Sequence, residues 1–242
     1  MLLRLRSIAF NLCLYVSAIV VGLLATPALF LPRRAAVWVI RNLSRLVIWF
    51  LKITAGTNYE IRGTVPEGAS LIAAKHQSMW DTIVFTALFD DPAMVLKGEL
   101  LWIPYYGWFS KKAKMIAIDR GAGASAIRRL VAQGKAALAA NRPIVIFPEG
   151  SRMAPGAPPA YKPGIAALYR QLGVPCVPVA VNSGLYWPRR RFLRRPGTIV
   201  LEFLAPIPPG LDRAAFMAEL ETRTETATAR LLAEGEKDLA RG

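Results

Sequence analysis

The sequence predicts an α/β protein with a roughly seven-stranded mixed sheet flanked by helices, preceded by a two-helix segment that associates with a membrane. Beyond residue 56, short apolar runs alternate with helical patterns, as they do where helices pack on the faces of a sheet. Hydrophobic residues make up 54% of a chain whose net charge is +15, which is typical of a protein that sits on an anionic surface. We therefore expect a membrane-associated part at 1–55 and an α/β domain at 56–242.

The first apolar stretch, residues 8–30, contains no charged side chain. At about 1.5 Å per residue, a helix of this length crosses a hydrocarbon core of about 30 Å. A cleaved signal peptide is the alternative, but its apolar region has about 7 to 15 residues, and Ala25-Thr26-Pro27 is a poor cleavage site. More cations follow the stretch than precede it, so we expect the α/β domain on the cytoplasmic side of the inner membrane.

Residues 35–52 form a different kind of helix. Its cations are spaced by 7, 4 and 7 residues, which places them along one line of the helix: Arg34, Arg41, Arg45 and Lys52. The other faces are mostly apolar, so the pattern predicts a helix lying at a membrane interface. A second spanning helix is the alternative, and its internal cations make it costly.

The two cysteines, Cys13 and Cys176, lie in an apolar stretch and in a predicted buried strand. Their separation predicts free thiols and a reducing compartment. One histidine and two separated cysteines leave little material for a zinc site. We expect neither a metal nor a bound cofactor, although a metal site made of carboxylates alone is an open alternative.

The domain beyond residue 56 alternates strands and helices. The predicted strands are 59–62, 71–74, 94–97, 115–118, 144–147, 176–181 and 198–203. The predicted helices are 80–89, 124–140, 163–171 and 212–233. This order predicts a sheet with helices on its faces, whose site forms where strand ends meet loops.

His76 is the single histidine of the chain and lies at the end of the strand 71–74. If the following helix begins only at Gln77 or Ser78, with Ser78 as its N-cap, the Asp81 carboxylate falls in the first turn and can reach the imidazole. A carboxylate there would fix the tautomer of the ring and stabilise its protonated form, so the pair indicates a general base with an orienting acid. The alternative is a histidine that merely caps a helix.

Three other strand ends carry polar side chains. Lys97 and Arg120 each follow an apolar run, and Glu149, Gly150, Ser151 and Arg152 follow another. The planar fork of arginine suits a phosphate group, because it makes paired, charge-assisted contacts. A solvated residue at the rim of the sheet is the alternative for each of them.

Two of these segments resemble signatures of the glycerolipid acyltransferase family. Residues 76–81 read HQSMWD and resemble its His-x4-Asp signature, and residues 147–152 read FPEGSR and resemble its Phe-Pro-Glu-Gly-Thr/Ser-Arg signature. Further blocks around Lys97, around Arg120 and at 174–179 resemble the rest of the family pattern, which is followed in order over about residues 55 to 205. Ser151 stands where the family often has threonine and keeps the hydroxyl.

The resemblance implies transfer of a fatty acyl group from a thioester, either acyl carrier protein (acyl-ACP) or acyl-CoA, to the free hydroxyl of lysophosphatidate. It makes His76 the base and Asp81 its orienter. The implied substrate-binding residues are Lys97, Arg120, Glu149, Gly150, Ser151 and Arg152. Among them Arg120 and Arg152 would bind phosphate, Lys97 would be a further phosphate contact, and Glu149 would bind a glycerol hydroxyl or hold an arginine.

The implied partners are membrane lipids, the lysophospholipid acceptor and the acyl donor. The run 188–196 contains five arginines around Phe192 and Leu193, and we expect it to dock on anionic head groups, where each cation contributes about 1 kcal/mol. Recruitment of an acidic acyl carrier protein is an alternative role for the run. Nucleic-acid binding is the rival, but a membrane-length apolar segment and the absence of a groove-reading motif argue against it.

Three other functions compete with the leading hypothesis. A lyso-ornithine-lipid acyltransferase would keep the chemistry and change the acceptor. A non-catalytic lipid-surface protein would keep the fold, but it would have no need of His76, Asp81 and Glu149 together. A Ser-His-Asp hydrolase would need a nucleophile elbow, and the chain contains no Gly-x-Ser-x-Gly sequence.

Overall fold

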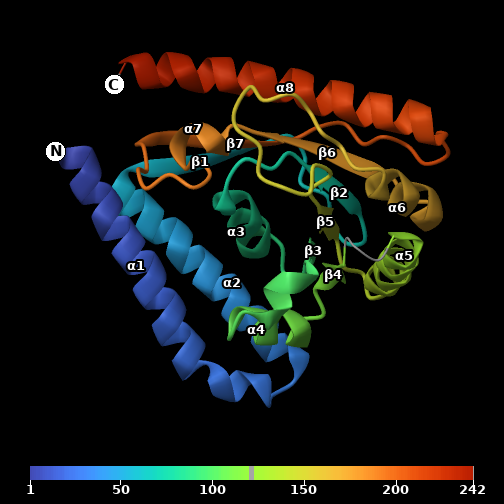
Figure 1. Ribbon diagram of the computed structural model, residues 1–242, viewed down its shortest axis with the longest axis horizontal. Helices are drawn as coiled ribbons and strands as arrows, with labels where there is room; N and C mark the ends of the chain where they lie inside the picture. The colour runs from blue at the N-terminus through green and yellow to red at the C-terminus, as the bar shows by residue number, and fades with distance from the viewer. Residues whose placement is uncertain (120–122, 242) are drawn as a thin grey trace.

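A computed structural model describes residues 1–119 and 123–241, and it contains the predicted mixed sheet of seven strands (Figure 1). The strands run in the order β1-β7-β6-β2-β5-β3-β4. Their bounds are Thr57–Arg62 (β1), Leu71–Ala74 (β2), Ala93–Lys97 (β3), Ile116–Ile118 (β4), Ile144–Ile146 (β5), Cys176–Val181 (β6) and Gly197–Phe203 (β7). Strands β6 and β7 pair antiparallel, and every other neighbouring pair of this sheet is parallel.

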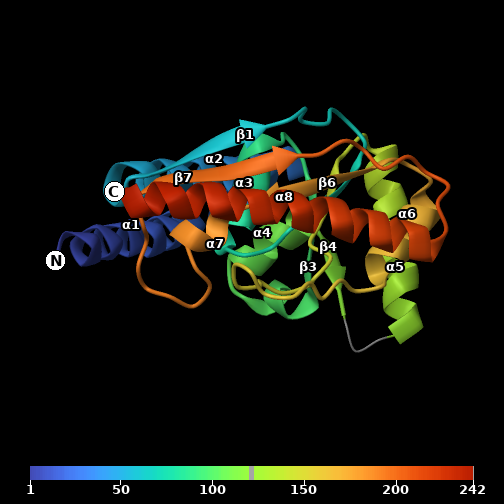
Figure 2. The same ribbon diagram turned by 90° about the horizontal axis from the view of Figure 1, so that it is seen from above.

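Helices cover both faces of the sheet. Their bounds are Leu2–Leu24 (α1), Thr26–Leu29 (η1), Arg33–Phe50 (α2), Leu51–Ala55 (η2), Met79–Leu88 (α3), Gly98–Trp102 (η3), Tyr106–Lys112 (α4), Gly123–Ala139 (α5), Gly164–Leu172 (α6), Ser183–Tyr186 (α7) and Arg213–Arg241 (α8). Figure 2 shows the long helix α8 lying along β6 and β7. The helices α1, α2 and α3 pack on the opposite face, as Figure 1 shows.

The short central strand β2 separates the two main cores. Successive side chains of a strand point to opposite faces. Ile72 and Ala74 accordingly pack in the core shared with α1, α2 and α3, and Leu71 and Ala73 pack in the core shared with α5, α6 and the first part of α8. All four are buried, because a parallel sheet covered on both faces has apolar residues in both directions. The end of β2 is therefore fixed from both sides.

Helices α1 and α2 form an antiparallel hairpin joined by η1 (Figure 1). Within the described residues, α1 is the one helix that is long and apolar enough to cross a membrane, and 22% of its most apolar window is buried. The predicted apolar stretch 8–30 is not one helix, because α1 ends at Leu24 and the turn η1 contains Pro27. Side chains such as Leu12 and Ile19 remain exposed along the outer side of α1.

Two of the four cations in the predicted basic stripe, Arg41 and Arg45, contact other parts of the protein. Helix α2 lies along α3, where Ser44 Oγ is 2.7 Å from Thr86 Oγ1. Arg45 Nε donates to the Ala87 carbonyl at 3.3 Å, and Arg41 pairs with Asp90. These two cations meet oxygens at and just beyond the end of α3, although Arg45 remains exposed like Arg34 and Lys52.

The arginine-rich run 188–196 also differs from the expectation. Four of its arginines are exposed, but Arg194 is 6% exposed and lies beneath α1. Its guanidinium is 4.8 Å from the ring of Trp187, and it donates to the Asn11 side chain and to carbonyls of its own loop. Burial lowers the pKa of Arg194 to about 10. Arg194 thus ties the loop to α1 and is not available to a lipid head group.

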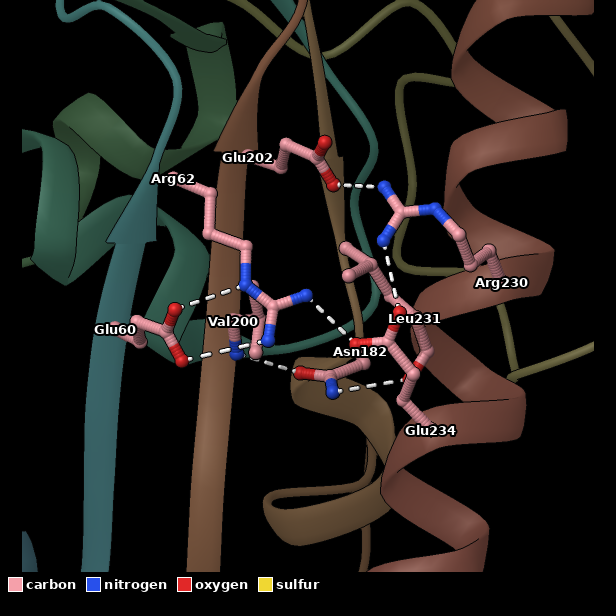
Figure 3. Close-up of polar contacts among 8 residues, drawn as sticks. All are labelled: Glu60, Arg62, Asn182, Val200, Glu202, Arg230, Leu231 and Glu234. Carbon is pink, nitrogen blue, oxygen red and sulfur yellow. Dashed lines mark hydrogen bonds and ion pairs between the residues drawn. The ribbon is translucent and has the colours of Figure 1, made fainter.

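Helix α8 is longer than predicted and is held to the sheet by a chain of charges (Figure 3). Arg62 Nη1 donates to Glu234 Oε2 at 2.6 Å, and Glu234 Oε1 accepts from Arg230 at 2.8 Å. Beneath them Asn182 joins three elements: its Oδ1 accepts from the Val200 N–H at 2.8 Å, and its Nδ2 donates to the Leu231 carbonyl at 3.2 Å. These contacts hold α8 to the sheet as far as Glu234, one residue beyond the predicted end of the helix.

A second group of ion pairs connects α2 to the α/β domain. Asp91 Oδ1 accepts from Arg33 Nη1 at 2.8 Å and from Arg142 Nε at 3.1 Å. The Arg142 side chain is 5% exposed and also donates to the carbonyls of Pro92 and Ala113. Burial raises the pKa of Asp91, but the hydrogen bond from Arg33 and the charge of Arg142 outweigh it and hold the pKa below its ordinary value.

We predict that Asp91→Asn destabilises the protein by about 1 to 3 kcal/mol, because it weakens charge-assisted hydrogen bonds to a buried arginine. The midpoint of thermal unfolding in detergent should fall by roughly 2–4 °C per kcal/mol. An acid with a lowered pKa stabilises the folded state above about pH 4 and loses that contribution as the pH falls through its folded value, so the difference should shrink in acid. Asp90→Asn is the matched control, because the Asp90 side chain is 84% exposed. Equal midpoints for the two variants at neutral pH would contradict the prediction.

Candidate active site

His76 lies two residues beyond β2, between the strand and helix α3. The predicted N-cap is confirmed: the Ser78 side chain accepts from the Trp80 N–H, and the helix begins at Met79. This start places Asp81 in the first turn, where its carboxylate turns back toward the end of the strand. His76 Nδ1 is 2.9 Å from Asp81 Oδ2.

Asp81 is completely buried and is surrounded by donors. Its Oδ2 accepts from the N–H groups of Gln77 at 2.7 Å and Ser78 at 2.8 Å, and its Oδ1 accepts from the Ser183 hydroxyl. An ionised carboxylate only accepts hydrogen bonds, so the neutral His76 ring must present N–H at Nδ1. The other ring nitrogen, Nε2, then carries a lone pair.

The imidazole of His76 is partly exposed and stacks on an aromatic ring. The His76 side chain is 13% exposed, and its ring stacks on Phe147 with 4.0 Å between centroids and 20° between planes. Phe147 follows β5, which pairs parallel with β2, so the two strands end side by side. The second signature segment therefore lies directly beside the histidine.

Glu149 is part of a buried charged network. Its Oε1 accepts from Lys75 Nζ at 2.7 Å, and its Oε2 accepts from the His76 N–H at 3.2 Å. Lys75 also donates to Glu225 of α8 at 2.8 Å, and the Tyr161 hydroxyl donates to Glu225 at 2.9 Å. Burial raises the pKa of Glu149, and Lys75 opposes that shift.

This network gives Glu149 a role different from the two considered from the sequence. Its side chain is 0% exposed, and both carboxylate oxygens are occupied, so it meets a lysine and a backbone amide rather than a glycerol hydroxyl or an arginine. It fixes the backbone of His76, whose carbonyl in turn accepts from the Met153 N–H at 2.7 Å. Glu149 and Asp81 thus hold the histidine by its main chain and by its ring.

The loop after β5 carries the remaining residues of the second signature. Gly150 has φ +65°, a conformation that favours glycine, and its N–H donates to the Phe147 carbonyl at 2.9 Å. Ser151 follows with a half-buried side chain whose hydroxyl lies 3.8 Å from Met153 Sδ. Arg152 comes next and is also half-buried. The tight turn at Gly150 therefore brings a hydroxyl and a guanidinium to the strand ends near His76.

Arg152 lies in a positive environment. Burial lowers its pKa, the charges of Arg189 and Arg190 lower it further, and Asp81 raises it. Arg189 Nη1 donates to the backbone carbonyl of Arg152 at 2.8 Å, which keeps these cations together. Among the described carboxylates, none forms an ion pair with the Arg152 guanidinium. An anionic ligand would suit this place.

Of the other two predicted phosphate contacts, the structure describes one. Lys97 is exposed at the end of β3, in register with Ile118 of β4. Because β2, β5 and β3 are consecutive and parallel, Lys97 lies on the same edge of the sheet as His76. Arg120 lies outside the described residues.

Sequence reasoning missed four residues of this site. Ser183 follows β6 much as His76 follows β2, so a polar residue at another strand end was the available signal. Lys75 adjoins the first signature, and a cation inside an apolar run was a weak sign of a buried pair. Glu225 and Tyr161 lie far away in the chain, and nothing in their local sequence marks them.

Nothing here assigns a metal to the site. Over the ranges 1–119 and 123–241, no three His, Cys, Asp or Glu side chains gather in a group that could hold a metal ion. The expectation of a reaction without metal or bound cofactor stays a prediction.

We predict that Lys75→Met destabilises the protein by about 3 to 5 kcal/mol, because it leaves the buried Glu149 without a charge partner. Adding Glu149→Gln to the same chain should restore part of the loss, since a neutral amide replaces the uncompensated charge. Thermal unfolding in detergent measures both changes, and the exposed Lys162→Met is the control. A Lys75→Met protein as stable as Lys162→Met would show that the network does not hold the site together.

Comparison with known proteins agrees with this geometry. The "Acyltransferase" family model matches residues 57–182, which is more than half of the chain. A 1-acyl-sn-glycerol-3-phosphate acyltransferase of Pseudomonas aeruginosa is 36% identical over 95% of this chain and 91% of its own length. A lyso-ornithine lipid O-acyltransferase of the same organism is 31% identical over 76% of this chain and 78% of its own length.

A solved structure shows the same fold. The crystal structure of the 1-acyl-sn-glycerophosphate acyltransferase of Thermotoga maritima superposes with a TM-score of 0.72 at 22% identity, covering 95% of this chain and 94% of that one. The similarity therefore spans the N-terminal hairpin as well as the sheet. The family match and the 36% identical relative show that this chain belongs to the acyltransferase family.

Proposed function

We propose that this chain transfers a fatty acyl group from acyl-ACP or acyl-CoA to the free hydroxyl of 1-acyl-sn-glycerol-3-phosphate, forming phosphatidate. The observation that carries the proposal is the hydrogen bond between His76 Nδ1 and the buried Asp81, which leaves Nε2 as a proton acceptor on a partly exposed ring. The 36% identical relative supports the choice of reaction.

The proposed reaction begins with the acceptor hydroxyl beside His76. Nε2 takes the hydroxyl proton as the oxygen attacks the thioester carbonyl, and the resulting imidazolium faces the Asp81 carboxylate. A C–O bond forms, and the C–S bond breaks when the tetrahedral intermediate collapses. The imidazolium then protonates the departing thiolate, so His76 ends the cycle neutral. General-base catalysis of this kind contributes about 10² to 10⁴ in rate.

The cations on the same edge of the sheet are the proposed phosphate site. Arg152 has no carboxylate partner among the described residues, and its planar fork suits a phosphate. Lys97 and Arg120 are proposed as further contacts. The Gly150 N–H already donates to the Phe147 carbonyl, so we assign the oxyanion of the intermediate to the amides that follow, at Ser151 and Arg152.

A lyso-ornithine lipid is the second candidate acceptor, because a relative that acts on it is 31% identical. The charges around Arg152 favour phosphate instead. A head group with a free amine would place a positive charge beside Arg152, Arg189 and Arg190. A purely lipid-binding role is disfavoured because it gives no reason for burying Asp81 behind a histidine.

Membrane placement belongs to the same proposal. A long-chain acceptor resides in a bilayer, so its enzyme must work at the lipid surface. The apolar helix α1, whose outer side chains are exposed, supplies the anchor. We propose that it holds the protein at the inner membrane with the α/β domain on the cytoplasmic side.

We predict that His76→Ala abolishes acyl transfer, with a loss of about 10² to 10⁴ in kcat, without changing membrane binding. Transfer of a radiolabelled acyl group in liposomes measures the activity, and flotation of the liposomes measures membrane binding. Lysophosphatidate and lyso-ornithine lipid should be offered side by side.

Each result of that assay decides one part of the proposal. Product from lysophosphatidate that disappears in the variant supports both acceptor and base. Product formed only from lyso-ornithine lipid would correct the acceptor. A His76→Ala protein with native activity would contradict the mechanism.

We further predict that Ser183→Ala lowers kcat about tenfold and leaves KM for the acceptor nearly unchanged. The reason is that the Ser183 hydroxyl donates to Asp81 and not to substrate, and a hydrogen bond to a charged group is worth about 1.5 to 3 kcal/mol. Ser70→Ala is the control, because Ser70 is another buried serine but precedes β2 at the far end of the strand. Equal activity of the two variants, or a rise in KM alone, would remove Ser183 from the catalytic arrangement.

A further inference from the structure

The segment formed by η3 and α4 presents large apolar side chains to the outside. Trp102 is 83% exposed, Ile103 46%, Trp108 45% and Tyr106 42%. Single exposed apolar residues are ordinary, but a contiguous patch of them marks a binding surface. The sequence indicated no helix here, although residues 97–108 belong to one of the blocks that resemble the family pattern.

The backbone of this segment is held so that these side chains stay outside. Gly107 packs so closely on the preceding turn that a Cβ there would lie 2.1 Å from the Leu101 carbonyl oxygen. Tyr105 has φ 60°, and its ring contacts Trp108 at 5.0 Å between centroids. Trp102 and Ile103 therefore lie on a turn of fixed shape.

This patch continues onto the turn of the N-terminal hairpin. Phe109 of α4 shares a buried cluster with Ala36 and Val39 of α2. A Cβ on Gly22 of α1 would lie 3.1 Å from Tyr105 Cγ, so the two segments are in direct contact. Figure 1 shows α4 beside the joined ends of α1 and α2.

The hairpin turn is also exposed and apolar. Leu24 is 77% exposed, Phe30 86% and Leu31 53%. These side chains and those of η3–α4 lie on two parts of the chain that contact each other, and we call the two sets together the apolar face. One binding surface can therefore contact both parts at once.

The charges around this face are mostly positive. Its exposed or half-buried cations are Arg34, Lys97, Lys111, Lys112 and Lys114, and Glu99 is the one acid within residues 97–114. Lys111 Nζ lies 5.3 Å from the centre of the Trp102 ring. Tryptophan beside lysine is typical of a membrane interface, where the ring lies at head-group depth and the cation meets anionic lipid.

We propose that η3–α4 is a second membrane-contacting element, which rests on the same anionic phospholipid surface as the hairpin turn. The proposal rests on the membrane location put forward above and adds where the α/β domain touches the bilayer. Lys97 is the last residue of β3 and directly precedes η3. Docking η3–α4 would therefore hold the edge of the sheet that carries His76 beside the lipid head groups, where the phosphate of a lipid acceptor lies.

A fluorescent label at Ile103→Cys tests the proposal. The background is Cys13→Ser, because Cys176 is fully buried and does not compete for the reagent. The matched control is the label at Thr226→Cys, an exposed position on α8, which lies on the far side of the molecule from α4 in Figure 1. Both proteins are mixed with phosphatidylcholine vesicles containing about 30% phosphatidylglycerol, and bound protein is recovered by flotation.

On bound protein, the label at 103 should shift to the blue and become several-fold less accessible to iodide, whereas the label at 226 should not change. Protection at 103 should weaken on vesicles of phosphatidylcholine alone. A protein that floats with the vesicles and transfers acyl groups, yet leaves position 103 as accessible as position 226, would overturn this inference alone. A protein that does not float would overturn the membrane location on which it rests.

Discussion

A buried carboxylate, that of Asp81, is the point on which the rest of the site depends. Removing an ionised carboxylate from water costs several kcal/mol unless donors surround it. Here two backbone amides, the Ser183 hydroxyl and the His76 ring supply those donors. They come from the end of β2, from the start of α3 and from the end of β6, so the carboxylate joins three elements at one place. The orientation of the imidazole follows from this arrangement.

A second buried carboxylate completes the support of His76. Glu149 accepts from the His76 N–H and from Lys75, and Lys75 connects it to Glu225 on α8. The His76 ring is fixed by Asp81 and Phe147, and its main chain is fixed by Glu149 and Met153. For the base that we propose, such support means little reorganisation when substrate arrives, which is the condition for effective proton transfer. The C-terminal helix thereby contributes to the site although it lies on the far face of the sheet.

The N-terminal hairpin is part of the same packed body. Phe10 and Leu14 of α1 and Val47 of α2 belong to the core that contains Ile72 of β2 and Trp80 of α3. Arg33 and Arg194 add polar links to Asp91 and to Asn11. In the membrane placement that we propose, a hairpin that shares a core with the sheet sets the orientation of the site toward the lipid surface. A flexible linker would not impose any orientation.

Local sequence predicted the parts of the fold that local forces determine. The strands 71–74 and 176–181 have their predicted bounds, because a strand buried on both faces is a continuous apolar run. The N-cap at Ser78 also followed from sequence, because capping involves neighbouring residues. The partners of Lys75 did not, since Glu149 and Glu225 are distant in the chain and become neighbours only when β5 and α8 pack beside β2.

The same limit explains the two main corrections. Arg194 looked like the other arginines of its loop, and its burial depends on Trp187 and on the contact with α1. Helix α8 extends past its expected end, where Glu234 pairs with Arg230 one turn earlier and with Arg62 of β1; helical spacing shows the first pair but not the second. Each correction involves a contact with a residue that is distant in the sequence. Sequence alone predicted that His76 and Asp81 form a pair, and the folded structure shows their contact and the residues that hold them.

The most direct test of this account is the tautomer of the His76 ring. His76 is the single histidine, so a chain labelled with ¹⁵N-histidine gives one imidazole in the NMR spectrum of the detergent-bound protein. The hydrogen bond to Asp81 predicts that the neutral ring carries its proton on Nδ1 and that Nε2 is unprotonated. Asp81→Asn should disturb this preference. A native ring protonated on Nε2 would contradict the central claim, because the nitrogen assigned to take the acceptor proton would already hold one.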